Sequence, residues 1–274
     1  MPLLFALLVD ERPRPLVPYE WAWSLHPSVF VGTGLLGALY VWGIRTLRRR
    51  QSLPPPPAWQ PAAFAGGLLL MLLSLNGPMH DLSDYYLFSV HMLQHLVLTL
   101  ALPPLLIAGT PGWLLRPVLG YPGVLPVARV LTRPVVAAAI YTVTIAVWHL
   151  PWWYDLMMRS HEVHIFTHLM FMAAATIMWW PVMSPVPELP RLPPGPGMLY
   201  LFLVGIPMQL VAAFITLSRD VLYPWYEIAP RTFGLSPIDD QVLGGLLMWV
   251  PGNLWMFLAI GVLFFRMARE SERA

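Results

Sequence analysis

The sequence predicts an all-α membrane protein, a bundle of about seven transmembrane helices that forms a single polytopic domain over residues 1–274. Composition is the first reason: 57% of the residues are hydrophobic and 11% are charged, whereas a soluble domain carries about 25% charged residues. Segment length is the second. Apolar stretches of about 17 to 25 residues recur along the chain, which is the length a helix needs to cross about 30 Å of hydrocarbon.

The predicted spans follow one another with short connectors between them. We place the spans at about 28–45, 61–77, 86–109, 134–150, 163–182, 198–218 and 240–265. The first span ends in an arginine run, and the second follows the prolines at 54–57. The third carries the motif HMLQH, the fourth ends at the motif WHLPWWYD, and the fifth carries HIFTH. A Pro-rich connector over 185–197 precedes the sixth, and the seventh begins with SPIDDQ.

The arginines predict the orientation of the bundle. Cytoplasmic loops of membrane proteins are enriched in basic residues, and the 16 basic residues here are all arginine. Eleven of them fall in the first, third and fifth connectors and the C-terminal tail, and five fall on the opposite side. We therefore expect the N-terminus to be extracytoplasmic and the C-terminus to be cytoplasmic. The net charge of +2 is too small to indicate a nucleic-acid partner.

All eight histidines fall in the outer half of this predicted topology. Their positions are His26, His80, His91, His95, His149, His161, His164 and His168. No role follows from the sequence for His26, His80 or His161. The chain contains no cysteine, so a metal site would have to use imidazole, thioether or carboxylate ligands.

Two HxxxH pairs are the main candidates for metal ligands. His91 and His95 are one helical turn apart, so both imidazoles lie on one face of the third span. His164 and His168 repeat the spacing at the same predicted depth in the fifth span. Imidazoles at that depth are costly when they face lipid. Each histidine could instead form a separate interhelical hydrogen bond. The HExxH pattern of zinc proteases is missing from both pairs.

The seventh span adds a carboxylate and a thioether. Asp240 lies at its start, where it could cap the helix or bind a metal, and Met248 lies two turns further in. Gly244 and Gly245 would let a neighbouring helix approach closely. Imidazole and thioether without thiolate suit copper, whose Cu(I) form accepts soft ligands. The residue types therefore indicate an outer-leaflet copper site, although most methionines in so apolar a chain serve packing.

Four motifs in order resemble the bacterial CtaG assembly factors of caa-type cytochrome c oxidase. They are HMLQHLVLTLALPPLLIAGTP at 91–111, WHLPWWYD at 148–155, HIFTHLMFM at 164–172 with the following WWP, and DQVLGGLLMWVPG at 240–252. The resemblance covers about residues 60–266. It implies a non-enzymatic, multi-pass protein of the bacterial plasma membrane that delivers copper to the oxidase. The positions it implies as functional are His91, His95, His149, His164, His168, Asp240, Gln241 and Met248.

The same resemblance implies partners, and the residues leave other functions open. The expected partners are the oxidase subunits, the lipid bilayer and an extracytoplasmic copper donor protein. One alternative is a haem-b electron carrier in which His95 and His168 are the axial ligands. A di-metal oxygenase would need more histidines and carboxylates than the spans supply. A channel would need a polar track beyond Gln209 and Asn253 in the inner half.

Overall fold

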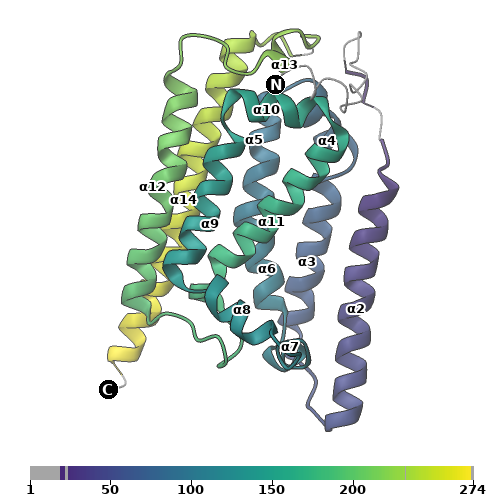
Figure 1. The fold of residues 1–274 in the computed structure, drawn as a ribbon, viewed down its shortest axis with the longest axis vertical. Coiled ribbons are helices and arrows are strands. Elements are labelled where there is room, and N and C mark those ends of the chain that lie inside the picture. Colours follow the sequence, from purple (N-terminus) through teal and green to yellow (C-terminus); the bar gives the residue numbers. More distant parts are fainter. Residues whose placement is uncertain (1–18, 22–23, 232, 273–274) are drawn as a thin grey trace.

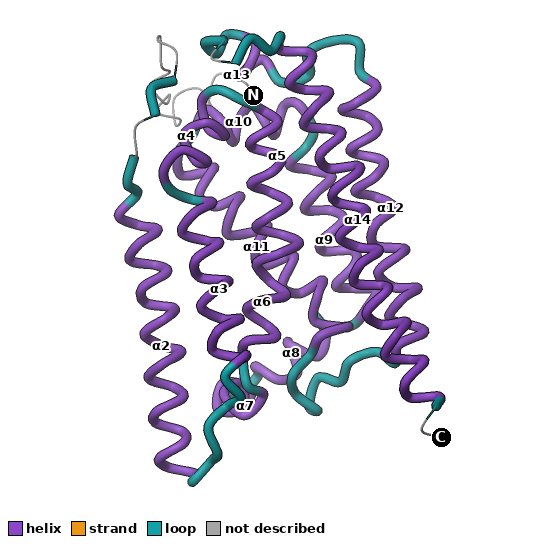
Figure 2. Tube along the Cα trace, turned by 180° about the vertical axis from the view of Figure 1, so that it is seen from behind, coloured by secondary structure: helices purple, strands orange, loops and turns teal. Residues whose placement is uncertain are grey.

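The computed structural model describes residues 19–21, 24–231 and 233–272, and within these ranges it is helical with no strand (Figures 1 and 2). The all-α prediction is confirmed. The elements are α2 (Pro27–Gln51), α3 (Trp59–Ser74), α4 (Gly77–Tyr85), α5 (Phe88–Leu96), a π-helical turn η1 (Val97–Ala101), α6 (Leu102–Gly109), α7 (Gly112–Leu119), α8 (Val124–Leu131), α9 (Pro134–Trp148), α10 (Pro151–Arg159), α11 (His161–Met183), α12 (Pro194–Leu217), α13 (Pro224–Glu227) and α14 (Pro237–Ser271).

The structure contains between five and eight candidate membrane spans, a range that includes the predicted seven. Five segments are long and apolar enough to cross a bilayer: α2, the continuous segment from α5 to α6, α11, α12 and α14. Three bent pairs, α3–α4, α7–α8 and α9–α10, could each add one. The helices α7 and α8 have 8 residues each and fold back on each other by 120° at one end of the bundle (Figure 1). Each is only about 12 Å long, too short to cross alone, so this pair is the weakest of the three candidates.

The connectors contain helices that the sequence analysis did not predict. Short helices α4, α10 and α13 lie together at the end of the bundle opposite α7 and α8 (Figure 1). Each has a proline in its first turn, where the fixed φ of proline favours a helix start. Gly77 adopts a φ of 63°, a left-handed conformation that suits glycine, between α3 and α4. His80 therefore lies on a helix and not in a loop.

The span that carries the first HxxxH pair is the centre of the bundle. In its apolar stretch 61% of the residues are buried, against 17% in α2, which lies at the edge of the bundle (Figures 1 and 2). Helix α14 packs against α5 and α12, and two glycines allow the close approach. A Cβ on Gly244 would overlap the Phe88 ring, and one on Gly245 would overlap the Thr216 side chain. The predicted role of these glycines in helix packing is confirmed.

The π-helical turn joins the histidine-bearing half of this span to its proline-bearing half. Pro103 has no N–H to give to the carbonyl of Thr99 one turn earlier. The indole Nε1 of Trp179 on α11 donates to that carbonyl instead, at 3.0 Å. Buried backbone carbonyls in the bilayer need a partner. The interruption of the helix is thus used to bond α11 to the central span.

Candidate metal centre

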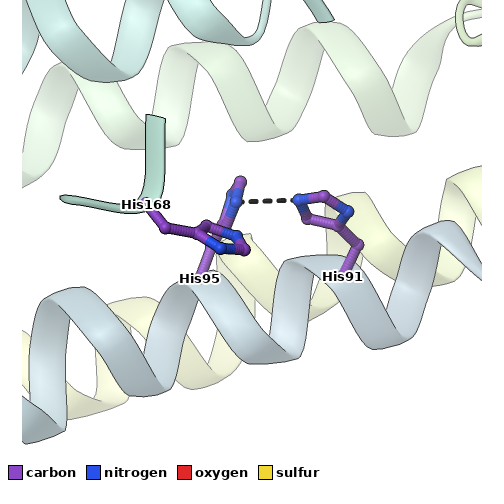
Figure 3. A group of neighbouring side chains, drawn as sticks. All are labelled: His91, His95 and His168. Carbon is purple, nitrogen blue, oxygen red and sulfur yellow. Dashed lines mark hydrogen bonds between the residues drawn. The ribbon is translucent and has the colours of Figure 1, made fainter. Parts of the chain in front are cut away.

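The site begins with the two histidines of α5. His91 and His95 are 0% and 5% exposed, and their Nε2 atoms lie 2.8 Å apart (Figure 3). Two nitrogen lone pairs repel each other at that distance. One of the two Nε2 atoms therefore carries a proton and donates it to the other. The i,i+4 spacing of the sequence places both rings on one face of the helix, as predicted.

Helix α11 brings the second pair of histidines against the first. The ring centroid of His168 lies 5.5 Å from that of His95 and 5.9 Å from that of His91. The ring of His164 stacks on His91 with centroids 5.3 Å apart and an interplanar angle of 10°. Figure 3 shows His168 reaching toward the other two rings from a different helix. The two HxxxH pairs, which the sequence places at the same depth, thus lie side by side in the structure.

The hydrogen bonds of His91 indicate which of its two ring nitrogens carries the proton. Its Nδ1 lies 2.9 Å from the hydroxyl of Tyr226 and 3.3 Å from the carbonyl of Ser83. Because the Tyr226 hydroxyl donates to that same carbonyl, we assign the Nδ1 proton to His91 as the donor. The lone pair of His91 is then on Nε2, which faces His95. Such bonds to the remote nitrogen orient metal-binding imidazoles in proteins.

Several other imidazole nitrogens in the cluster lack a hydrogen-bond partner among the described residues. His149 Nδ1 lies 2.7 Å from the carbonyl of Ile145, which can only accept, so His149 Nε2 carries the lone pair. That Nε2, His95 Nδ1 and His168 Nε2 are all buried without a partner. The His149 ring centroid lies 5.7 Å from that of His95. Most buried polar atoms in proteins are bonded, so this concentration indicates a capacity to bind a ligand.

A carboxylate that the sequence analysis did not select completes the site. Asp84 on α4 is 1% exposed; its Oδ2 lies 3.3 Å from His164 Nδ1 and its Oδ1 lies 3.5 Å from His80 Nδ1. Two groups of three residues have ligand atoms within 4.8 Å of one another: His91, His95 and His168, and Asp84, His91 and His164. His80 and Asp84 are four residues apart. Had the sequence predicted a helix for this connector, that spacing would have placed both side chains on one face and marked Asp84 as a candidate.

Asp240 and Gln241 have structural contacts instead. The N-cap of α14 is Ser236 and not Asp240, which corrects the capping interpretation of the sequence. Both carboxylate oxygens of Asp240 accept backbone N–H groups at the start of α5, from Phe88 at 2.7 Å and Ser89 at 3.1 Å. Gln241 Oε1 accepts the backbone N–H of Leu222 at 2.6 Å. The side chains of this motif therefore attach α14 to α5 and to the loop after α12.

Met248 packs in the apolar core between α14 and α5. On α14 it is one turn from Gly244, which faces Phe88 and Met92, and one turn from Gly252, which faces Leu96. Phe88, Met92 and Leu96 form the face of α5 next to the one that carries the histidines. Met248 is buried in the apolar core of the bundle. The structure thus brings together the five histidines among the seven predicted metal ligands, while Asp240 bonds to the start of α5 and Met248 stays a predicted ligand.

The remaining histidines extend the cluster toward the start of α2. The ring centroids of His26 and His80 lie 4.3 Å apart, and those of His80 and His164 lie 6.4 Å apart. Burial, followed by the proximity of His80, lowers the pKa of His26, so this imidazole is neutral at neutral pH. His161, one turn before His164, is exposed. A row of imidazoles therefore runs from the beginning of α2 into the bundle.

A large cavity lies at the opposite end of the molecule. It measures about 660 Å³ and is lined by α3, α6, α11, α12 and α14, with Trp59 and Trp179 among its walls and Arg191 and Arg266 among its polar groups. Arg266 and Arg191 belong to the connectors and tail that the sequence analysis placed on the cytoplasmic side. The histidine cluster is compact and separate from this cavity.

Comparison with known proteins places the chain in a family. The chain matches the family described as cytochrome c oxidase caa3 assembly factor (Caa3_CtaG) over residues 38–270. It is 25% identical to uncharacterized proteins of Mycobacterium bovis and Mycobacterium tuberculosis over 283 residues, and 24% identical to one of Mycobacterium leprae over 290 residues. These alignments cover 96% of this chain and 42% of each relative, so the chain spans less than half of their length. No solved structure matches.

The match includes both HxxxH pairs, Asp84 and the motif at 240–252, and it covers most of the chain. A multi-pass helical bundle and four motifs in the expected order agree with it. The chain belongs to the family of caa3-type cytochrome c oxidase assembly factors.

Proposed function

We propose that this protein binds a copper ion through His91, His95 and His168 and delivers it to the terminal oxidase whose assembly its family serves. The observation that carries the proposal is the convergence of these three buried imidazoles, with nitrogen atoms within 4.8 Å of one another. Metal–imidazole bonds of about 2.0 Å hold tetrahedral ligand nitrogens about 3.3 Å apart. Small rotations of the side chains would bring the three nitrogens to one ion.

The ligand set supports copper over other metals. Imidazole binds copper, zinc, iron and nickel, and affinity at a given site rises toward copper among the divalent ions. Three neutral imidazoles add no negative charge, which suits a monovalent Cu(I) ion in a medium of low dielectric constant. His149 Nε2 is a further nitrogen next to His95, available as a fourth ligand.

A haem is less compatible with the same residues. A bis-histidine haem would need an open slot for the porphyrin between His95 and His168. His91 lies 2.8 Å from His95 through its Nε2, and the Phe171 ring centroid lies 4.6 Å from that of His95. The space beside these rings is thus filled by other side chains. A single ion fits this packing, and a macrocycle does not.

A carrier role follows from the placement of the site. The ligands lie at the end of the bundle that the arginine bias predicts to be extracytoplasmic, and the predicted location is the bacterial plasma membrane. An ion held by neutral imidazoles can be taken from a donor protein outside the membrane and passed to an oxidase subunit by ligand exchange. We propose that the protein transfers the ion and catalyses no reaction.

Metal analysis of the protein purified in mild detergent tests the site. We expect one copper per chain, and we expect His91→Ala, His95→Ala and His168→Ala each to weaken binding by at least about tenfold. His161→Ala is the matched control, because it removes an exposed imidazole from the same helix as His168. Copper retained by all three variants, or lost equally in the control, would exclude this site.

Deletion of the protein tests delivery. The oxidase polypeptide should remain in the membrane but contain less copper and have less activity, and added external copper should partly restore both. Oxidase from the deletion strain with its normal copper content would rule out a role in copper supply.

A further inference from the structure

The group formed by Asp84, His91 and His164 differs from the three-histidine group in charge. Both groups use His91, but one consists of three imidazoles and the other includes a buried carboxylate. His80 and the hydroxyl of Ser83 also approach the Asp84 carboxylate, at 3.5 Å and 3.1 Å. Nothing in the family description distinguishes these two groups.

We propose that Asp84, His91 and His164 form a second cation position, which selects divalent transition-metal ions such as Zn²⁺ or Cu²⁺ and cannot be occupied together with the His91–His95–His168 position. This inference rests on the proposed function, because it divides the copper site into two overlapping parts. The shared His91 makes occupancy of the two positions mutually exclusive.

Electrostatics gives each position its preference. The attraction of a carboxylate for a cation is proportional to the charge of the cation, so it is twice as large for a divalent ion as for a monovalent ion at the same distance. A position with Asp84 gains most from a divalent ion. Two divalent ions beside one carboxylate would bury uncompensated positive charge, which is costly. The cluster is therefore built for one ion at a time.

The location of the second position gives it a role in uptake. Asp84 lies on α4, and His80 and His26 continue from it toward the start of α2. An ion arriving along these imidazoles would reach Asp84 and His164 before it reached His95 and His168. Because His91 belongs to both positions, the ion can move between them while it keeps one ligand.

Titration with two probes, Zn²⁺ alone and Cu⁺ alone under reducing anaerobic conditions, separates the positions. Asp84→Asn keeps the size of the side chain and removes its charge. We expect it to weaken Zn²⁺ binding by at least about tenfold and to change Cu⁺ binding by less than about threefold. His168→Gln should have the opposite pattern, His91→Gln should weaken both ions, and bound Zn²⁺ should compete with Cu⁺.

The control variant and the contrary results separate a failure of the second position from a failure of the copper site. Asp81→Asn makes the same change on the same helix, outside both groups, and should leave both affinities unchanged. His164→Gln gives a second test should Asp84→Asn fail to fold. If Asp84→Asn and His168→Gln weaken Zn²⁺ and Cu⁺ equally, or if Cu⁺ binds and Zn²⁺ does not, the second position is excluded while the copper site stands. A protein that binds neither ion overturns the proposed function as well.

Discussion

The variant Asp240→Ala tests whether Asp240 caps α5 or binds a metal. The sequence presents Asp240 as a ligand candidate, whereas its two carboxylate oxygens accept the N–H groups of Phe88 and Ser89 at the start of α5. The first N–H groups of a helix have no partner within the helix. Asp240 is 0% exposed, so in the alanine variant water would not readily replace the lost bonds.

The size of the effect follows from the two bonds. A hydrogen bond to a charged group contributes about 1.5–3 kcal/mol, and loss of a helix cap costs about 0.5–2 kcal/mol. Two such bonds, each at the lower limit of the hydrogen-bond range, place the expected loss for Asp240→Ala at about 3 kcal/mol. At about 2–4 °C per kcal/mol for a chain of this size, the midpoint of thermal unfolding should fall by about 6–12 °C.

The assay combines thermal unfolding in detergent, followed by circular dichroism, with metal analysis of the folded protein. Asp240→Ala should lower the unfolding midpoint and leave one copper bound. Asp240→Asn, which keeps one acceptor oxygen, should lose about half as much stability. Asp239→Ala is the control, because Asp239 is adjacent and exposed. An unchanged midpoint with loss of copper would refute the capping role and restore Asp240 as a ligand.

Three further predictions concern the bundle. Cysteines placed at Leu25, which is exposed, and at Ser271 should react with a membrane-impermeant reagent from outside only at position 25; reaction only at 271 would reverse the topology. Gly245→Ala should destabilise the bundle by about 1–3 kcal/mol in denaturant unfolding, because its Cβ would overlap Thr216, while Gly261→Ala, which meets no atom within 4 Å, should not; equal stability of the two variants would contradict the packing. Trp179→Phe should lower the free energy of unfolding by about 0.6 kcal/mol through the lost bond to Thr99. A variant that keeps its stability but loses its bound copper would mean that the bond also positions the histidines.

The spans and the histidine pairs were predictable because their signals are local. Hydrophobic length gives the spans, and the four-residue spacing gives the shared face of His91 and His95 and of His164 and His168. Asp84 was not predictable in the same way, because its connector has no apolar periodicity that predicts a helix. The contact between Asp240 and α5 was unpredictable for another reason. A residue at the start of one helix can cap a different helix, and Asp240 and Phe88 are far apart in the sequence.

The surroundings of Met248 depend on how α14 packs against α5, and not only on its spacing from Asp240. Two turns of helix separate it from Asp240, which suggested a carboxylate and a thioether on one side of the same site. The glycines on either side of Met248 set the contact between α14 and α5, and that contact uses the face with Phe88 and Leu96. Which face of a helix meets its neighbour depends on tertiary packing, and a single sequence does not encode it in a readable period.

The π-helical turn Val97–Ala101 decides where the central span can absorb a change in length. A π turn accommodates one more residue than an α turn, and each residue rotates a helix by about 100°. The lower half of the span is fixed by Gly109, whose position against the backbone of Gln60 and Phe64 leaves no room for a Cβ. Deleting one residue from the turn would convert it to an α turn and keep His91 and His95 close to their present register. Deleting a residue from the α-helical stretch between the turn and Gly109 would instead rotate both imidazoles by about 100° away from α11 without altering a single ligand.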